Sequence, residues 1–172
     1  MKTIYLEFTS PKQWFAPYSW LICLFERATY SHVRIKFESG WWSWSVLEAA
    51  GSSVRLIGEK ASRHYPVKIH HRYAVTLSDD EYKRMLKLLR YAGVKYGTLQ
   101  AIGIGLQRLF RLSKNPFADG DYSFICSELV AYFLFQVVQL EVPDSELPDF
   151  ETAGPKAIKN WLDKHPEIAR PA

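Results

Sequence analysis

The chain contains the stretch Ser123-Phe124-Ile125-Cys126-Ser127-Glu128-Leu129-Val130, in which a polar approach leads into an apolar helix. Helical periodicity predicts that this helix runs from Ile125 to Leu140, with Cys126 in its first turn. Backbone N–H groups at a helix N-terminus favour an anion, which raises the thiolate fraction of a thiol there, and they can also stabilise a developing oxyanion. Cys126 is therefore a candidate nucleophile, although a cysteine in an apolar helix is more often an inert core residue.

A candidate base for this nucleophile lies far upstream, in Tyr30-Ser31-His32-Val33-Arg34-Ile35. Alternating apolar and polar residues predict a strand over residues 32–37, with His32 on its polar face. In covalent catalysis an imidazole takes the proton of a neighbouring thiol, which is the role expected of His32. The structural alternative is an ordinary strand histidine. Four further histidines are rival bases in less suitable contexts: His64, His70, His71 and His165.

A third group is needed to hold the imidazole in one tautomer and orientation. The turn at Glu38-Ser39-Gly40 predicts a hairpin whose second strand, running from Trp42 to Ala49, contains Val46-Leu47-Glu48-Ala49-Ala50. Glu48 then lies on the strand paired with that of His32. We expect it to orient the ring, with an outward-facing glutamate as the alternative.

The remaining pattern predicts an α+β protein whose sheet is antiparallel and mostly contiguous in sequence. Further strands are expected at Lys2–Phe8, Val54–Ile57 and Val67–Thr76, the last with Val67, Ile69, His71, Tyr73 and Val75 on one side. Further helices are expected at Phe15–Arg27, from Ser78 to Gly93, at Thr98–Leu112 and from Pro155. Polar or irregular connections are expected at Ser113–Asp121 and Pro143–Pro155.

Composition sets limits on the class of protein. A chain of 172 residues, 48% hydrophobic and 15% aromatic, predicts a single domain over 1–172 with an ample core. The net charge of +4, without a block of like charge, gives no support for nucleic acid as a partner. The apolar run from Trp14 to Phe25 is too short to span a bilayer, and no secretory signal pattern is present. We expect Cys23 to be a buried structural residue, with a Cys23–Cys126 disulfide as the alternative.

Four motifs, taken in chain order, carry a family resemblance: Tyr-Ser-His-Val, Val-Leu-Glu-Ala-Ala-Gly, Lys-Tyr-Gly and Cys-Ser-Glu-Leu-Val. They resemble the circularly permuted papain-like hydrolases of the NlpC superfamily, and most closely the YiiX-like group related to lecithin:retinol acyltransferase. The resemblance implies a papain-like α+β fold of the permuted NlpC type, with a central antiparallel sheet packed against helices and the nucleophile at a helix N-terminus.

The same resemblance implies roles for individual residues. Cys126 matches the nucleophile, His32 the base and Glu48 the third catalytic position. Substrate-binding positions are implied for Tyr96, which lines the nucleophile's pocket, for Ser127 in the Cys-Ser-Glu signature, and for Tyr30. The implied mechanism requires no metal ion and no organic cofactor.

The resemblance also implies thiol-dependent cleavage at a carbonyl, and we expect an amide hydrolase acting on peptidoglycan-type peptides. A bacteriophage-encoded component of a virion tail would fit a domain without an export signal, and otherwise a cytoplasmic location is expected. One alternative is a lipid-directed acyltransferase or thioesterase, with Trp14, Phe15, Trp20 and the Trp41–Trp44 turn facing lipid. Another is a structural module of a larger particle with a vestigial or occluded site. The turn containing Trp41, Trp42 and Trp44 is either an aromatic platform for a ligand or a partner surface, or a half-buried hairpin.

Overall fold

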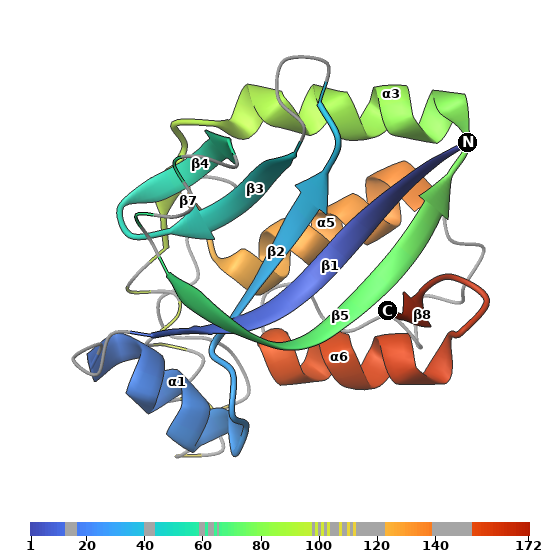
Figure 1. The fold of residues 1–172 in the computed structure, drawn as a ribbon. Helices are drawn as coiled ribbons and strands as arrows, with labels where there is room; N and C mark the ends of the chain where they lie inside the picture. Colours follow the sequence, from blue (N-terminus) through green and yellow to red (C-terminus); the bar gives the residue numbers. More distant parts are fainter. Residues whose placement is uncertain are drawn as a thin grey trace.

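A computed structural model describes residues 1–12, 17–39, 44–58, 66–97, 123–138 and 153–172, with the single positions 61, 64, 99, 101, 103, 107, 110 and 112. Over these residues the protein is α+β (Figure 1). The strands are β1 (Lys2–Pro11), β2 (His32–Phe37), β3 (Ser45–Ala50), β4 (Ser53–Gly58), β5 (Val67–Leu77), β6 (Lys95–Tyr96), β7 (Ser123–Phe124) and β8 (Arg170–Pro171). The helices are α1 (Pro17–Glu26), α3 (Asp79–Lys87), a 3-10 turn (Leu88–Tyr91), α5 (Cys126–Val138) and α6 (Pro155–Lys164).

The strands form one sheet in the order β7-β6-β4-β3-β2-β1-β5-β8. All neighbouring strands pair antiparallel except β6 and β7, which pair parallel. The prediction of an antiparallel sheet is therefore confirmed. Its order is less contiguous than expected, because β5 pairs with β1 and not with β4. This arrangement gives β1 a central place between β2 and β5.

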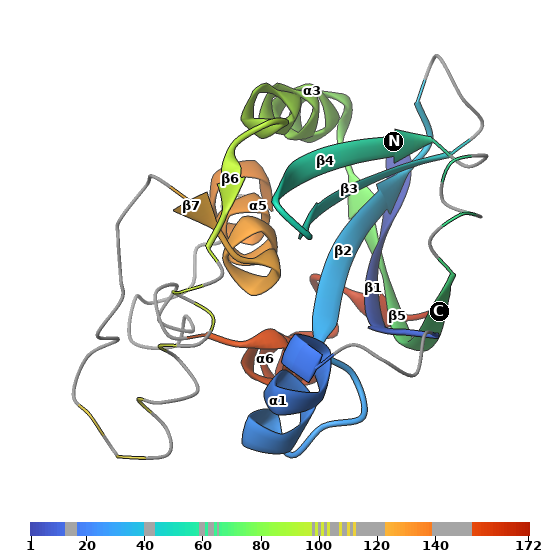
Figure 2. The same ribbon diagram turned by 90° about the vertical axis from the view of Figure 1, so that its left-hand side faces the viewer.

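The helix α5 packs on one face of the sheet, against β2 and β3. Figure 2 shows α5 beside the strands, with α3 towards one end of the sheet and α6 towards the other. The core between the layers contains Ile35 and Phe37 from β2, and Leu129 and Phe133 from α5, all fully buried. Alternation along β2 thus turns Ile35 and Phe37 to α5 and Arg34 to the opposite face, while His32, the first residue of the strand, contacts Cys126 at the start of α5.

An ion network crosses that opposite face. Glu7 in β1 is fully buried and pairs in register with Arg34 in β2 and Arg72 in β5. One carboxylate oxygen accepts from Arg34 Nη2 at 2.8 Å, and the other accepts from Arg72 Nη2 at 2.8 Å. The buried charge of Glu7 is therefore paired on both sides, as burial of a carboxylate requires.

A β-bulge interrupts the pairing of β1 with β5. Phe8 pairs with His71, but the next residue, Thr9, pairs with Ile69, so one residue of β5 is unmatched. The bulge turns the β5 residues that precede it, including Ile69, to the opposite face of the sheet from the one predicted. The predicted alternation of Val67–Thr76 therefore holds at the buried Tyr73 and Val75 but is wrong at Ile69, which is 40% exposed.

The predicted helix starts are confirmed where the structure describes them. Ser78 caps α3 with Glu81 in a capping box, and Pro155 occupies the first turn of α6. The predicted helix to Gly93 is shorter than expected, because α3 ends at Lys87 and a 3-10 turn follows. Most of the predicted helix over 98–112, the loop at 113–121 and the connection before residue 153 lie outside the described residues. Among the described residues no helix is long and apolar enough to cross a bilayer.

Candidate active site

His32 is the first residue of β2, where the strand emerges from the core. The backbone N–H of Ser31 donates to the carbonyl of Thr9 at 3.1 Å, and Thr9 then pairs with His32. This pairing fixes the backbone immediately before and at the histidine. The side chain of His32 is 16% exposed, so its ring is largely shielded but still accessible from one side.

Glu48 in β3 contacts the ring directly. The register of β2 and β3, with Ile35 opposite Leu47, brings Glu48 to the polar face that carries His32. His32 Nε2 lies 3.1 Å from Glu48 Oε2, and the carboxylate side chain is only 4% exposed. Glu48 therefore lies against His32, as expected, and does not face outward into solvent, which was the alternative.

A second cation holds the same carboxylate. Arg55 Nε and Nη2 donate to Glu48 Oε1 at 2.9 and 2.7 Å, which leaves Oε2 for the histidine. Sequence reasoning missed Arg55, although the signal was present. A tight turn at Gly51, whose φ is +68°, brings Glu48 directly opposite Arg55 in the pairing of β3 with β4.

These partners set the charge state of Glu48. Burial alone would raise the pKa of the carboxyl, because it disfavours the charged form. The hydrogen bond and charge of His32, together with Arg55, outweigh burial and lower the pKa of Glu48 to about 2. Glu48 is therefore an ionised hydrogen-bond acceptor at neutral pH.

Cys126 is the first residue of α5, one residue after the predicted start at Ile125, so its predicted place in the first turn of the helix is confirmed. Its side chain is 3% exposed. The turn is fixed locally, since the Ile125 N–H donates to Glu128 Oε2 at 3.2 Å and the Leu129 N–H donates to the Ile125 carbonyl at 3.1 Å. The thiol therefore lies at the N-terminus of a helix, where the helix dipole favours an anion.

The thiol and the imidazole interact. Burial of the His32 ring opposes its protonation, but the charge of a Cys126 thiolate, a side-chain hydrogen bond with Cys126 and the contact with Glu48 raise the pKa of His32 to about 10. Since Nε2 faces Glu48, Nδ1 is the nitrogen available to exchange a proton with the thiol. The arrangement favours a charged imidazolium in contact with the Glu48 carboxylate and the Cys126 sulfur.

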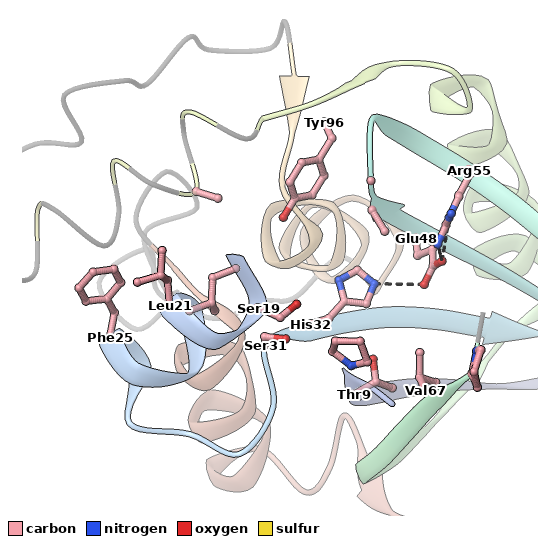
Figure 3. A pocket seen from close by; sticks show the side chains of 16 residues that line it. Thr9, Ser19, Leu21, Phe25, Ser31, His32, Glu48, Arg55, Val67 and Tyr96 are labelled. Atoms are coloured by element: carbon pink, nitrogen blue, oxygen red, sulfur yellow. Dashed lines mark hydrogen bonds and ion pairs between the residues drawn. The ribbon is translucent and has the colours of Figure 1, made fainter. Parts of the chain in front are cut away.

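Two adjoining cavities give access to this centre. The larger, about 370 Å³, is lined by His32, Glu48 and Arg55 on one side and by α1 on the other (Figure 3). The smaller, about 30 Å³, is lined by Cys126 and Ser127. Tyr96 and Ser31 line both cavities, so the small cavity at the thiol lies next to the larger one.

Two of the three expected substrate-binding residues line the cavities, and the third does not. Tyr96 lines both cavities, and burial together with the charge of Cys126 raises the pKa of its phenol, so it is a neutral donor. Ser127 is fully buried and lines the smaller cavity, with no hydrogen-bond partner for its Oγ among the described residues. Tyr30 is also buried, but its ring packs against Phe8 and His71. It is not among the residues that line either cavity.

The rival residues have other contacts. His70 Nε2 lies 2.8 Å from Ser10 Oγ, and His165 stacks on Trp161 with ring centroids 4.3 Å apart. Both cysteines are free, so the alternative of a Cys23–Cys126 disulfide is wrong. The prediction that Cys23 is buried also needs correction. Its side chain is partly exposed, in a helix whose Trp20, Leu21 and Leu24 are exposed as well.

Of the tryptophan-rich turn, Trp41 and Trp42 lie outside the described residues. Trp44 packs on Tyr5, with ring centroids 5.7 Å apart, and the Lys36 ammonium lies 4.9 Å from the centre of the Trp44 ring. Trp44 thus covers the polar face of the sheet. In the part of the chain that the structure describes, no three His, Cys, Asp or Glu side chains are grouped as metal ligands.

Comparison of the sequence with protein-family models gives no match, and comparison with the curated proteins gives none either. The chemical interpretation of the site therefore depends on its own geometry.

Proposed function

We propose that the protein is a thiol-dependent hydrolase that cleaves an acyl bond through a covalent intermediate on Cys126. The observation that supports this proposal is the imidazole of His32 in contact with both the Glu48 carboxylate and the Cys126 thiol, at the first residue of a helix. A histidine held by a carboxylate beside a thiol is the arrangement that activates a cysteine nucleophile.

The reaction proceeds in two halves. Cys126 gives its proton to His32 Nδ1, and Sγ attacks the carbonyl carbon of the substrate. The oxyanion that forms accepts a hydrogen bond from the Cys126 backbone N–H. The intermediate collapses to a thioester on Cys126, and His32 gives the proton to the leaving group. A water molecule, deprotonated by His32, then attacks the thioester, which releases the acid and restores the thiol.

Glu48 and Arg55 support this cycle without touching the reacting atoms. Glu48 keeps the proton on Nε2, so that Nδ1 faces the thiol. Arg55 holds the other carboxylate oxygen and fixes the direction of the Glu48 side chain. Arg55 is therefore a positioning residue in this proposal.

The order of these groups along the chain supports a finer proposal for the fold. His32 and Glu48 come from the first half of the chain, and Tyr96 and Cys126 follow. That order, with an antiparallel sheet on one side and a cysteine-bearing helix on the other, fits a papain-like fold of the permuted NlpC type.

For the substrate, an amide bond in a peptidoglycan-type peptide stays the first prediction. A second candidate, a lipid-directed acyltransferase or thioesterase, is favoured by a specific observation. The wall of the larger cavity opposite His32 is apolar and is made by Leu21, Ile22 and Phe25 of α1. A long acyl chain would lie against such a wall more favourably than against water.

The two candidates are separated by incubating the protein with peptidoglycan fragments and, in parallel, with phospholipid and acyl thioester substrates. Mass spectrometry of the products and of the intact protein detects cleavage and an acyl group on Cys126. We expect one substrate class to give products with wild type and none with Cys126→Ala. If neither class gives a product or an acylated Cys126, the proposed hydrolase activity is wrong.

A further inference from the structure

The helix α1 has an unusual exposed face. Four residues at helical spacing are exposed, namely Pro17, Trp20, Leu21 and Leu24, and all of them are apolar. Trp20 is 65% exposed, Leu21 44% and Leu24 70%. A surface helix normally presents polar residues to water, so a continuous apolar face of this kind is typical of an interaction surface.

This face continues into the larger cavity. Leu21 belongs to both, because it is exposed at the surface and also lines the cavity, next to Ile22 and Phe25. Figure 3 shows Leu21 and Phe25 on α1 across the cavity from His32. An apolar group on the outer face of α1 therefore has an apolar path towards the candidate active site.

The end of α1 is anchored and carries positive charge. Glu26, the one charged residue of the helix, is buried and accepts from the Lys156 backbone N–H at 2.6 Å, at the start of α6. The next residue, Arg27, is exposed, and its carbonyl accepts from the Lys156 ammonium at 3.3 Å. Two cations thus border the apolar face at the C-terminal end of α1.

We propose that α1 docks on an anionic lipid surface. Trp20, Leu21 and Leu24 enter the boundary between headgroups and acyl chains, where tryptophan is favoured, and Arg27 and Lys156 face lipid phosphates. Apolar residues bordered by cations match a surface that is apolar inside and negatively charged outside. Docking does not depend on the proposed hydrolase, but the further step, in which an acyl chain passes Leu21 to reach Cys126, rests on that proposed function.

The test is vesicle flotation of the full chain. Vesicles of phosphatidylcholine alone are compared with vesicles containing 30% phosphatidylglycerol. We expect binding to the anionic vesicles and a loss of about tenfold in the partition coefficient for each of Trp20→Gln and Leu24→Gln, because each removes a side chain that would be buried in lipid. Arg27→Gln should weaken binding to anionic vesicles and leave the weak binding to neutral ones unchanged.

A matched control is Leu86→Gln. Leu86 is 37% exposed on α3, which Figure 1 shows at the other end of the molecule from α1. This variant should bind vesicles like wild type. Circular dichroism checks that each variant is folded, and the rate of Cys126 alkylation without lipid should be the same in Trp20→Gln and Leu24→Gln as in wild type.

Two results would overturn the inference. One is equal vesicle binding, or none, by wild type and by the two α1 variants. The other is a dimer in light scattering that the α1 variants convert to monomers, since α1 would then be an interface between copies. Failure of the hydrolase proposal is separate, because Cys126→Ala should still bind vesicles if docking is correct.

Discussion

His32 has two partners that act on its proton. His32 Nε2 lies 3.1 Å from Glu48 Oε2, and the Cys126 thiol also forms a hydrogen bond with the ring. Burial alone would favour a neutral ring. The pKa of about 10 shows which effect is stronger, because the two anionic partners together exceed the cost of burial.

Arg55 provides a test of this account at the level of one side chain. Arg55→Gln removes a charge and two hydrogen bonds from Glu48, so the pKa of Glu48 should rise from about 2 towards its ordinary value of 4.5. The acidic limb of the pH profile for Cys126 alkylation should then move to higher pH. A pKa near 4.5 would lower the ionised fraction of Glu48 at pH 3.5 by about tenfold, and the rate at that pH should fall by up to the same factor. Arg55→Lys, which keeps the charge, should move the limb less.

The control for Arg55 is Lys95→Gln, which removes an exposed cation from the adjacent strand β6. It should leave the pH profile unchanged. A purely structural role for Arg55 predicts lower thermal stability with an unmoved acidic limb, and that result would contradict its assignment as a positioning residue.

The main residues of the site could be predicted from sequence because each has a local signature. Alternation placed His32 and Glu48 on the polar face of paired strands, and the start of the apolar helix placed Cys126. Arg55 required the register of a second hairpin, which follows from the turn at Gly51. The separation of Tyr30 from the cavities could not be predicted, because the packing of its ring on Phe8 depends on contacts between distant segments.

At the scale of elements, Glu7 links three strands. Its carboxylate bridges Arg34 and Arg72, and its side chain is fully buried. Glu7→Gln should lower the free energy of unfolding by about 3 to 5 kcal/mol, because it leaves the largely buried Arg34 without an anionic partner. Urea unfolding measures this loss.

Two comparisons make the Glu7 prediction specific. The double variant Glu7→Leu with Arg34→Met should lose less unfolding free energy than Glu7→Gln, because it replaces a buried ion pair with apolar groups. The remaining partner, Arg72, has a side chain that is 35% exposed and can reach water. Asp80→Asn breaks an exposed pair with Lys83 and should leave the free energy of unfolding almost unchanged. A loss in Glu7→Gln as small as in Asp80→Asn would contradict the structural role of the network.

Strands and helices with a strong local pattern of apolar residues were predicted well. Strands that depend on pairing between distant segments of the chain were not. The strand at His32–Phe37 and the helix starts at Asp79, Cys126 and Pro155 have their own alternation or capping residues. By contrast, β6 and β7 have two residues each and are defined by pairing with distant segments, β6 with both β4 and β7. The bulge opposite Phe8 likewise depends on how β5 fits β1, which no local pattern specifies.

At the scale of the molecule, the pair of His32 and Glu48 makes stability depend on pH. The pKa of Glu48 is lowered from 4.5 to about 2, so its contribution is complete above pH 4.5 and disappears as the pH falls towards 2. Against the effect of burial, Cys126 first and then Glu48 raise the pKa of His32 from 6.5 to about 10, so its contribution is complete below pH 6.5 and disappears as the pH rises towards 10. The pair therefore stabilises most between pH 4.5 and 6.5.

Urea unfolding of wild type and Glu48→Gln at a series of pH values measures this dependence. The difference in unfolding free energy should be about 1 to 3 kcal/mol between pH 4.5 and 6.5 and should shrink on both sides. A difference that does not change with pH would mean that the two groups are not charged partners in the folded state.

The two cysteines allow the most direct test of the central claim, which is that Cys126 is an activated nucleophile. Cys23 is the more exposed of the two, and burial, the largest effect on it, raises the pKa of its thiol. Exposure alone would therefore make Cys23 the faster to react, while activation by His32 favours Cys126.

The measurement is the rate of iodoacetamide modification of each cysteine at pH 7, followed by peptide mass spectrometry. The account predicts that Cys126 reacts about tenfold faster than Cys23 or more, and that His32→Ala removes this advantage without changing the rate at Cys23. Equally slow modification of both cysteines in the wild-type protein, or an unchanged rate at Cys126 in His32→Ala, would contradict it.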